Sequence, residues 1–355
     1  MHSEAEAWLE GLSPWPEEFG LGRMHELLEA LGHPERAFPA IHVVGTNGKT
    51  TATRTIAALL RAEGLRAGAY TSPHVLGWAE RLDTDADGFE HAIERVRPAA
   101  ERLGATQFEA LTAAALAEFE AQRFDVAVVE AGLGGRLDAT NVLDARVVLL
   151  TNVSLEHTEV LGETREAIAR EKLAVAKSGS VVVRGEPEWA PLVAGHEVVV
   201  GGAREAAEAF LGRPVGQVVG VQVPGRLERR GERELRDGAH NPAGAEWLVA
   251  RLAGEHVLVV SILADKDAGR MLRTLAHAGN RLVATSSSCP RALPAAELAR
   301  LAELHFAHVE AVGDPTTARL RAFELARSDE TVLVTGSLYL LADLEKAECR
   351  APVRG

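Results

Sequence analysis

Several residue types are scarce in this sequence, and each scarcity excludes a class of protein. Only two cysteines, Cys289 and Cys349, occur in 355 residues, too few for a disulfide framework. No apolar run is long enough to cross a membrane. The segment from Met1 to Glu10 is acidic and lacks the basic and apolar regions of a signal peptide. The sequence therefore predicts a soluble, cytoplasmic protein without a membrane partner.

Positive charge is also scarce. The chain has 38 Lys+Arg against 51 Asp+Glu, a net charge of -13. This balance argues against a nucleic-acid partner but allows a local basic pocket for phosphates. Lysine is the rarer of the two basic residues, since only Lys49, Lys172, Lys177, Lys266 and Lys346 are lysines.

Length and hydrophobic patterning predict two α/β domains. A chain of 355 residues exceeds the usual single-domain range. Continuous apolar strands alternate with helical patterns, which is typical of a parallel sheet covered on both faces. We predict an N-terminal P-loop ATPase-like domain with a doubly wound, mostly parallel sheet, and a smaller C-terminal Rossmann-like α/β domain. Their predicted limits are 1–223 and 237–355, with an interdomain linker at 224–236.

The individual elements follow from the same patterns. Within the linker, the charged stretch 228–234 is predicted to form a solvated hairpin. Strands are predicted at 41–44, 66–71, 125–130, 146–151, 256–262, 281–285 and 331–335, and helices at 4–31, 50–63, 89–103, 107–123, 164–177, 243–253, 268–278 and 294–304.

A phosphate-binding loop is the first motif with a chemical meaning. Gly45-Thr-Asn-Gly-Lys-Thr50 follows a predicted strand and opens a predicted helix. Glycines let backbone N–H groups approach phosphates, and the helix N-terminus adds positive potential. The lysine can neutralise phosphate oxygens, and the final hydroxyl can reach phosphate or Mg²⁺. The alternative is a strand-to-helix turn with an unrelated lysine. The motif predicts ATP binding by Gly45, Thr46, Asn47, Gly48, Lys49 and Thr50.

Further segments, in a fixed order, resemble one enzyme family. They are Ser72-Pro-His74, Glu130-Ala-Gly-Leu-Gly-Gly-Arg-Leu-Asp-Ala-Thr-Asn141, Glu156-His-Thr-Glu-Val-Leu-Gly162, Glu171-Lys172, Pro224-Gly-Arg226, Asp237-Gly-Ala-His-Asn-Pro242, Ala264-Asp-Lys-Asp267 and Gly336-Ser-Leu338. With the phosphate loop they resemble the folylpolyglutamate synthase/dihydrofolate synthase family of the Mur-ligase superfamily, over nearly the whole chain. The resemblance implies an ATP-dependent ligase that adds L-glutamate to a folate or to dihydropteroate through an acyl phosphate, and that acts as a monomer. Two alternatives are a peptidoglycan-type Mur ligase and a nucleotide-binding regulatory module without ligase activity.

The resemblance also implies roles for single residues. The lysine that matches Lys172 is carboxylated by CO₂ to a carbamate in the family, beside a second Mg²⁺. ATP is expected between the two domains, with the amino-acid substrate near Asp265-Lys-Asp267. The implied catalytic residues are Lys49, His157 and Lys172; the metal ligands are Ser72, Glu130, His157 and Lys172; and the further ATP contacts are Arg226 and Asp237. The implied substrate-binding residues are Thr106, Phe108, Glu109, Leu137, Asp138, Ala139 and His240, with Phe108 against the pterin ring.

The residues alone allow plainer roles. Ser72 before a proline is typical of a turn, and a single histidine such as His157 is typical of a hydrogen-bonded loop. Lys172 fits the solvated surface of a helix, and Phe108 fits a core position. Arg226 beside a glutamate fits a surface arginine, and residues 265–267 fit a charged turn. Glu130 is harder to dismiss, because an unpaired buried carboxylate is costly.

Three departures from the family pattern are visible. Glu156 replaces the usual aspartate before His157, and Lys49 is followed by two threonines, as in peptidoglycan Mur ligases. The stretch 184–224 is short for the family, in which an Asn-containing helix contacts the nucleotide. Only residues 203–207 are available as a counterpart, and they contain no Asn.

Overall fold

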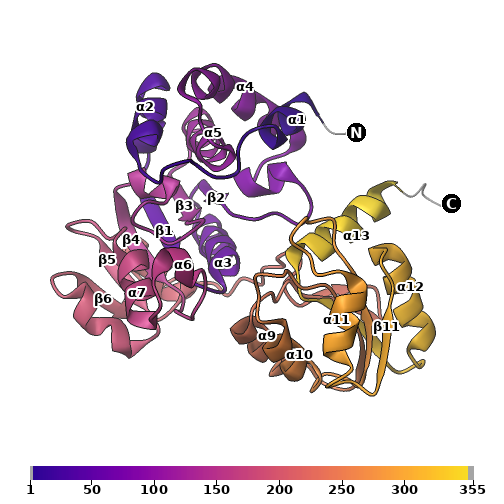
Figure 1. Ribbon diagram of the computed structural model, residues 1–355. Coiled ribbons are helices and arrows are strands. Elements are labelled where there is room, and N and C mark those ends of the chain that lie inside the picture. The colour runs from indigo at the N-terminus through magenta and orange to yellow at the C-terminus, as the bar shows by residue number, and fades with distance from the viewer. Residues whose placement is uncertain (1–2, 351–355) are drawn as a thin grey trace. The chain divides into compact units, whose positions relative to one another are not determined.

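The computed structural model describes residues 3–350 and divides into two compact units. The first unit comprises residues 1–72 and 78–221, and the second comprises 73–77 and 222–355. Each unit has a six-stranded, mostly parallel sheet with helices on both faces (Figure 1). The predicted fold class is therefore confirmed.

The first sheet is entirely parallel, with the strand order β2-β3-β1-β4-β5-β6. Side chains alternate across it as a two-residue period requires. Ile41 and Val43 of β1 pack with α3 and α8 on one face, and Ala40 and Val44 lie in the cluster formed with α4, α5 and α7 on the other. The strands are β1 (Ala40–Val44), β2 (Ala67–Tyr70), β3 (Val126–Glu130), β4 (Ala145–Leu150), β5 (Val181–Arg184) and β6 (Glu197–Val200). The helices are α1 (Glu4–Glu10), α2 (Gly22–Ala30), α3 (Lys49–Ala62), α4 (Ala86–Leu103), α5 (Gln107–Ala121), α6 (Thr158–Leu161), α7 (Arg165–Leu173) and α8 (Ala203–Leu211), with 3-10 helices at Pro34–Arg36, Trp78–Leu82, Ala139–Val142 and Pro187–Val193.

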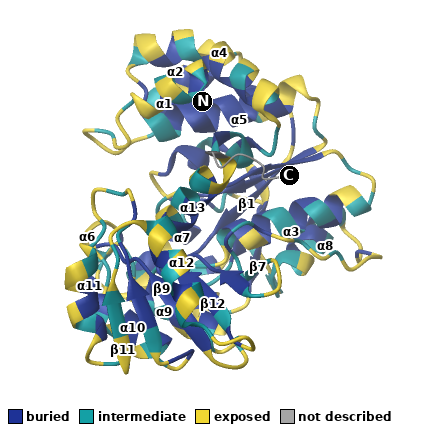
Figure 2. Ribbon diagram, turned by 90° about the vertical axis from the view of Figure 1, so that its right-hand side faces the viewer, coloured by how far each residue is buried: buried dark blue, intermediate teal, exposed yellow. Residues whose placement is uncertain are grey.

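The second sheet has the order β11-β10-β9-β12-β8-β7, and only the edge strand β7 is antiparallel to its neighbour. Leu258 and Val260 of β9 face α9, α10 and α11, whereas Val257 and Val259 face α12 and α13. Strands β1 and β9 are buried along their whole length (Figure 2). The strands are β7 (Glu228–Arg230), β8 (Glu234–Arg236), β9 (His256–Val260), β10 (Arg281–Ala284), β11 (His308–Ala311) and β12 (Thr331–Thr335). The helices are α9 (Pro242–Val249), α10 (Ala268–Leu275), α11 (Ala295–Ala302), α12 (Pro315–Leu325) and α13 (Leu338–Arg350).

The structure differs from the sequence prediction in several elements. The predicted helix 4–31 is two helices, because Gly11, Pro14 and Pro16 interrupt it. Strands β5, β6 and β11 were not predicted, and the short region 184–224 contains β6 and α8, which pack onto the first sheet.

The stretch 224–236, predicted as an interdomain linker, supplies the hairpin β7–β8 of the second sheet. The hairpin itself was predicted, but it is not solvated throughout, because Glu234 and Arg236 are buried. Residues 73–77 belong to the second unit, where Val75 packs in the cluster with Leu340 and Leu341. Across residues 3–350, no helix combines the length and apolarity needed to span a membrane.

Candidate active site

The phosphate loop connects β1 to α3 at the carboxyl edge of the first sheet. Gly45 has φ 146° and Gly48 has φ 80°, and such angles are available to glycine at little cost. A Cβ on Gly45 would also overlap the side chain of Thr151. Lys49 is the first residue of α3, and its Nζ donates to the carbonyl oxygens of Gly45 (3.1 Å) and Thr46 (3.3 Å). The side chain of Lys49 therefore folds back over the loop, toward Gly45 and Thr46.

A second segment, which the sequence did not single out, holds this loop. It follows β4 and includes Asn152 and Ser154. The N–H of Thr46 donates to Asn152 O (2.9 Å), and the N–H of Asn47 donates to Asn152 Oδ1 (3.1 Å). Asn152 Nδ2 donates to Asn47 O (3.0 Å), and the N–H of Ser154 donates to Thr46 Oγ1 (3.1 Å). The only sequence signal was its position after a buried strand, at the same sheet edge as the loop.

Glu130 is the central carboxylate of the site. It is the last residue of β3, pairs in register with Val43, and is 2% exposed. Its Oε1 accepts from Thr50 Oγ1 (3.1 Å), and its Oε2 accepts from the N–H of Ser72 (3.1 Å). Thr50, Ser72 and Glu130 thus come together from three segments at one edge of the sheet.

Lys172 of α7 is buried, 2% exposed, so the plainer interpretation of a solvated lysine is wrong. Its Nζ donates to Gly45 O (2.9 Å) and to Glu156 Oε1 (3.1 Å). Burial, with the positive charge of Lys49, lowers the pKa of Lys172 to about 8, although Glu156 opposes this shift. For Glu156, burial raises the pKa, but the charges of Lys49 and Lys172 outweigh it and lower the pKa overall.

His157 follows directly and opens the four-residue helix α6. It is exposed and has a left-handed backbone, with φ 46°. Its charge contributes to lowering the pKa of Glu156.

The predicted metal ligands can be tested against this chemistry. Within residues 3–350, no group of three or more His, Cys, Asp or Glu side chains is placed to hold a metal ion. Mg²⁺, however, is commonly held by one or two carboxylates together with water and substrate phosphates. The buried carboxylate of Glu130 beside the Thr50 hydroxyl supplies hard oxygen donors of this kind. The residues present therefore fit a divalent cation that is shared with a phosphate.

The Gly-Leu-Gly-Gly segment packs against the neighbours of the site, which explains its glycines. A Cβ on Gly132 would lie 2.6 Å from the Phe108 ring, and one on Gly134 would lie 2.8 Å from Leu161. A Cβ on Gly135 would lie 2.6 Å from the carbonyl oxygen of Lys172. At Gly135 the obstructing atoms are backbone atoms of α7, so this position requires glycine for α7 to pack here. At Gly132 and Gly134 the obstructing atoms are the ends of side chains, and Gly134 also has φ 69°, which favours glycine.

The predicted pterin side is built around the start of α5. Thr106 and Glu109 form a capping box, in which Glu109 Oε2 accepts from Thr106 N (2.8 Å) and Thr106 Oγ1 accepts from Glu109 N (3.3 Å). Glu109 also accepts from Arg23 Nε at 2.8 Å. Phe108 is half-buried and lies 6.1 Å from Tyr70 between ring centroids. Thr106 and Glu109 thus already cap the N-terminus of α5.

Asp138 is the most constrained of the companion residues, while Leu137 is 45% exposed and Ala139 is buried. Asp138 Oδ2 accepts from the N–H of Leu133 (2.7 Å), and its Oδ1 accepts from the N–H of Thr140 (3.0 Å). Burial raises the pKa of Asp138 above its ordinary value. The structure therefore fixes this carboxylate in the loop that packs on Phe108.

Arg226, Asp237 and His240 belong to the second unit. Asp237 Oδ2 accepts from the N–H of Leu227 (2.8 Å), and its Oδ1 accepts from the N–H of Ala239 (2.9 Å). Burial raises the pKa of Asp237, although the charge of Arg226 opposes the shift. His240 Nδ1 lies 2.8 Å from Gly238 O. The three residues are therefore gathered on one short stretch of the unit.

The segment 265–267 forms a charged turn in the second unit. Lys266 Nζ lies 3.1 Å from Asp265 Oδ2, and Arg291 Nη1 lies 3.1 Å from Asp265 Oδ1. Asp267 caps α10 by accepting from the N–H of Arg270 at 2.9 Å. Each of the three side chains thus has a local contact.

Comparisons with known proteins match both units. The chain matches the Mur ligase middle domain over residues 43–184 and the Mur ligase glutamate ligase domain over residues 225–338. It is 32% identical over 398 residues to folylpolyglutamate synthase of Lacticaseibacillus casei, covering 90% of this chain and 92% of that protein.

Solved structures give the same result. Mycobacterium tuberculosis folylpolyglutamate synthase complexed with ADP has a TM-score of 0.87 and 30% identity, with 98% of each chain covered. A bifunctional folylpolyglutamate synthase/dihydrofolate synthase with Mn, AMPPNP and L-glutamate bound has a TM-score of 0.85 and 30% identity, also with 98% of each chain covered. These names support the main functional hypothesis from the sequence and neither of its alternatives.

Proposed function

The chain belongs to the folylpolyglutamate synthase/dihydrofolate synthase family, and from that premise we propose that it joins L-glutamate to a folate or to dihydropteroate in an ATP-dependent reaction. The observation that carries the proposal is the first unit's sheet edge. There a phosphate loop, the buried carboxylate of Glu130 and two lysines converge. We further propose that the protein acts as a monomer in the cytoplasm.

The chemistry requires activation of a carboxylate. An oxygen of the acceptor carboxylate attacks the γ-phosphorus of ATP, the bond from that phosphorus to the β–γ bridging oxygen breaks, and ADP leaves. The glutamate amine then attacks the acyl phosphate, loses a proton, and phosphate departs as the amide forms. Negative charge concentrates around the phosphoryl group, so positioned cations contribute most of the stabilisation.

We assign the phosphates of ATP to the loop 45–50. Lys49 would exchange its contacts with the Gly45 and Thr46 carbonyls for phosphate oxygens, while the backbone N–H groups and the start of α3 provide further positive potential. Glu130, with Ser72, Thr50 and His157, would hold Mg²⁺, which neutralises phosphate charge when bound.

Lys172 is proposed to carry a carbamate beside a second metal ion. Neutral Nζ attacks the carbon of CO₂, a C–N bond forms, and the nitrogen loses a proton, so that a cation becomes an anionic oxygen donor. Because its pKa is lowered to about 8, a larger share of Lys172 is neutral near pH 7 than of an ordinary lysine. Burial and the adjacent Lys49 therefore support this modification, and an arginine could not replace the lysine.

The acceptor and the amino acid have their own proposed contacts. Phe108 would stack on the pterin ring, and Asp138, Leu137 and Ala139 would line its edge together with Thr106 and Glu109. Among these proposed contacts, Asp138 has the best defined position, because two backbone N–H groups hold its carboxylate. From the second unit, Arg226 and Asp237 are assigned to ATP, and His240 and the segment 265–267 to the substrate.

Product mass tests the proposal directly. The protein is incubated with ATP, L-glutamate and, separately, dihydropteroate or a tetrahydrofolate, and phosphate release is followed in parallel. We expect a product heavier by one glutamyl residue with at least one acceptor. A Lys49→Met variant serves as the control for phosphate-loop chemistry. Turnover only with a UDP-muramyl substrate, or ATP binding without any turnover, would overturn the assignment.

A further inference from the structure

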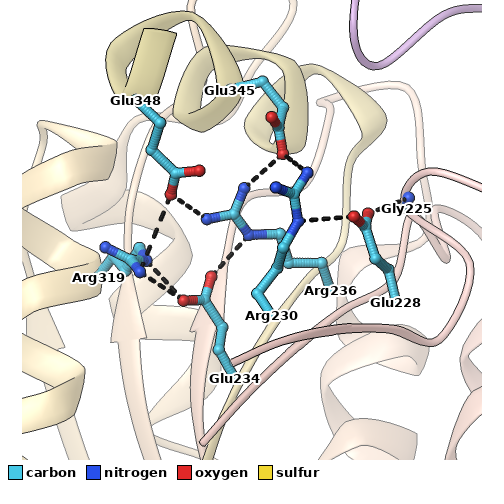
Figure 3. Close-up of polar contacts among 8 residues, drawn as sticks. All are labelled: Gly225, Glu228, Arg230, Glu234, Arg236, Arg319, Glu345 and Glu348. Carbon is cyan, nitrogen blue, oxygen red and sulfur yellow. Dashed lines mark hydrogen bonds and ion pairs between the residues drawn. The ribbon is translucent and has the colours of Figure 1, made fainter. Parts of the chain in front are cut away.

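Figure 3 shows a network of charged side chains in the second unit, with a buried centre. In the sequence it borders the segment that carries Arg226 and Asp237. Its centre is Arg236 of β8, whose side chain is 1% exposed. Arg236 Nε donates to Glu234 Oε1 (2.6 Å), Nη1 donates to Glu345 Oε1 (2.7 Å), and Nη2 donates to Glu348. One guanidinium thus binds carboxylates from its own strand and from α13.

Two more arginines extend the network. Arg319 of α12 donates through Nε (2.8 Å) and Nη2 (2.6 Å) to Glu234 Oε2. Arg230 of β7 donates to Glu345, and its Nε lies 2.6 Å from Glu228 Oε1. The charges therefore fasten both strands of the hairpin β7–β8 to the helices α12 and α13.

The network continues into the backbone around Arg226 and Asp237. Glu228 Oε2 accepts from the N–H of Gly225 (2.8 Å), and Gly225 O accepts from the N–H of Gly238 (2.8 Å). Asp237 then accepts from the N–H of Leu227 at 2.8 Å. Glu228 thus holds the turn that carries Arg226, and Arg236 immediately precedes Asp237.

The hairpin β7–β8 is short and rich in charged residues. β7 and β8 have three residues each. The strand β8 is also paired with β12, but β7 is the edge strand and all three of its residues are charged. Strands that are polar on both faces specify their register weakly. A slip of β7 by one residue against β8 would turn Glu228 and Arg230 to the opposite face of the sheet. It would separate Arg230 from Glu345, the carboxylate that Arg236 also binds. Buried ion pairs add little stability compared with apolar side chains, but removing one partner is strongly unfavourable. The network therefore selects one register of the hairpin.

We propose that Arg236 is a positioning residue for nucleotide binding: through its carboxylate partners it holds the hairpin in the register that presents Arg226 and Asp237 to ATP. The inference rests on the proposed function, because the ATP contacts of these two residues are themselves assigned there. A purely structural network would stabilise the unit without affecting how tightly the nucleotide binds.

The test compares nucleotide binding in matched variants of the full chain. Arg236→Met removes the central charge at similar volume, and Arg236→Lys keeps the charge but loses the three-way contact. Arg319→Met and Arg321→Met change neighbouring positions on α12; Arg319 pairs with Glu234 of the network, whereas Arg321 pairs with Glu310 and Glu324 outside it. For each variant, the Kd for ADP and the KM values for ATP and glutamate are measured well below its unfolding temperature.

We expect Arg236→Met to raise the Kd for ADP and the KM for ATP about tenfold, the loss that corresponds to one or two well-placed hydrogen bonds. The KM for glutamate should change little, Arg236→Lys should lie between Arg236→Met and wild type, and Arg319→Met should weaken ADP binding more than Arg321→Met. Wild-type ADP binding in Arg236→Met, even with a lowered unfolding temperature, would overturn the proposal.

Two further outcomes separate this inference from the proposed function. If Arg236→Met does not fold, equal ADP affinity in Arg319→Met and Arg321→Met overturns the positioning role. If the wild-type protein turns over no acceptor, the proposed function fails, while the ADP affinities of the variants still decide the role of Arg236.

Discussion

The two lysines at the first unit's site and the central arginine of the second unit's network have different partners. In the first unit, Lys49 contacts two neutral carbonyl oxygens, and Lys172 contacts one carbonyl oxygen and one carboxylate. In the second unit, Arg236 is matched by three carboxylates. A cation held by carbonyls keeps its charge for an incoming anion. The charge of a cation surrounded by carboxylates is neutralised, and its main effect is to fix the positions of the groups that it binds. Chemical roles are therefore expected for Lys49 and Lys172, and a positioning role for Arg236.

The largest expected effect concerns Lys172. We expect Lys172→Ala to lower ligase turnover on the order of a thousandfold or more, as for loss of a principal electrostatic group at a phosphoryl-transfer site. Bicarbonate with a short carboxylic acid should restore part of the activity, whereas Lys172→Arg should stay inactive because it cannot form a carbamate. Phosphate release measures all three. Full activity in Lys172→Ala would refute the carbamate.

Removing Arg236 should have the largest effect on stability. Arg236→Met removes the central partner of the buried Glu234 and Glu345. Leaving a buried charge unpaired costs about 3–5 kcal/mol, and that is the upper bound here because Arg319 and Arg230 still bind these carboxylates. Denaturant unfolding measures this cost. Arg321→Met removes pairs that are largely exposed, and should cost less than about 1 kcal/mol. If Arg236→Met and Arg321→Met lowered the free energy of unfolding equally, burial would not explain which ion pairs contribute to stability.

The proton on Lys172 provides a pH test. Its pKa of about 8 in the folded protein lies below the value near 10.4 of a free lysine. Between these values the unfolded chain binds a proton that the folded chain does not, so the free energy of unfolding should rise with pH. The rise relative to Lys172→Met should reach about 3 kcal/mol by pH 10.4. Unfolding is followed in CO₂-free buffer, and a constant difference between pH 7 and 10 would contradict the lowered pKa.

The smallest expected effect tests backbone packing at the first site. Gly135→Ala places a Cβ against the carbonyl oxygen of Lys172, and relieving such overpacking costs about 1–3 kcal/mol. Activity should also fall, because α7 must shift. Gly22→Ala is the matched control, since a Cβ there meets no atom within 4 Å. Equal stability of the two variants would remove the packing explanation for this glycine.

Much of the first site could be predicted from the sequence. The phosphate loop is contiguous, and Glu130 ends a strongly apolar strand, so local pattern placed both at the sheet edge. The support of the loop by Asn152 could not be predicted, because it depends on β4 lying beside β1. The burial of Lys172 could not be predicted either, because the helix α7 is polar along much of its length. Only the packing of α7 against the phosphate loop encloses the lysine.

The second unit was harder to predict at the level of side chains. The glutamates and arginines of 228–236 have the pattern of a solvated hairpin, and only α12 and α13 convert part of it into a buried network. The sequence by itself determined the two α/β units, the phosphate loop and the family, because strand hydrophobicity and contiguous motifs are local properties. The tertiary structure alone decided which charges are buried and what they bind, because a side chain's partners come from segments distant in the sequence.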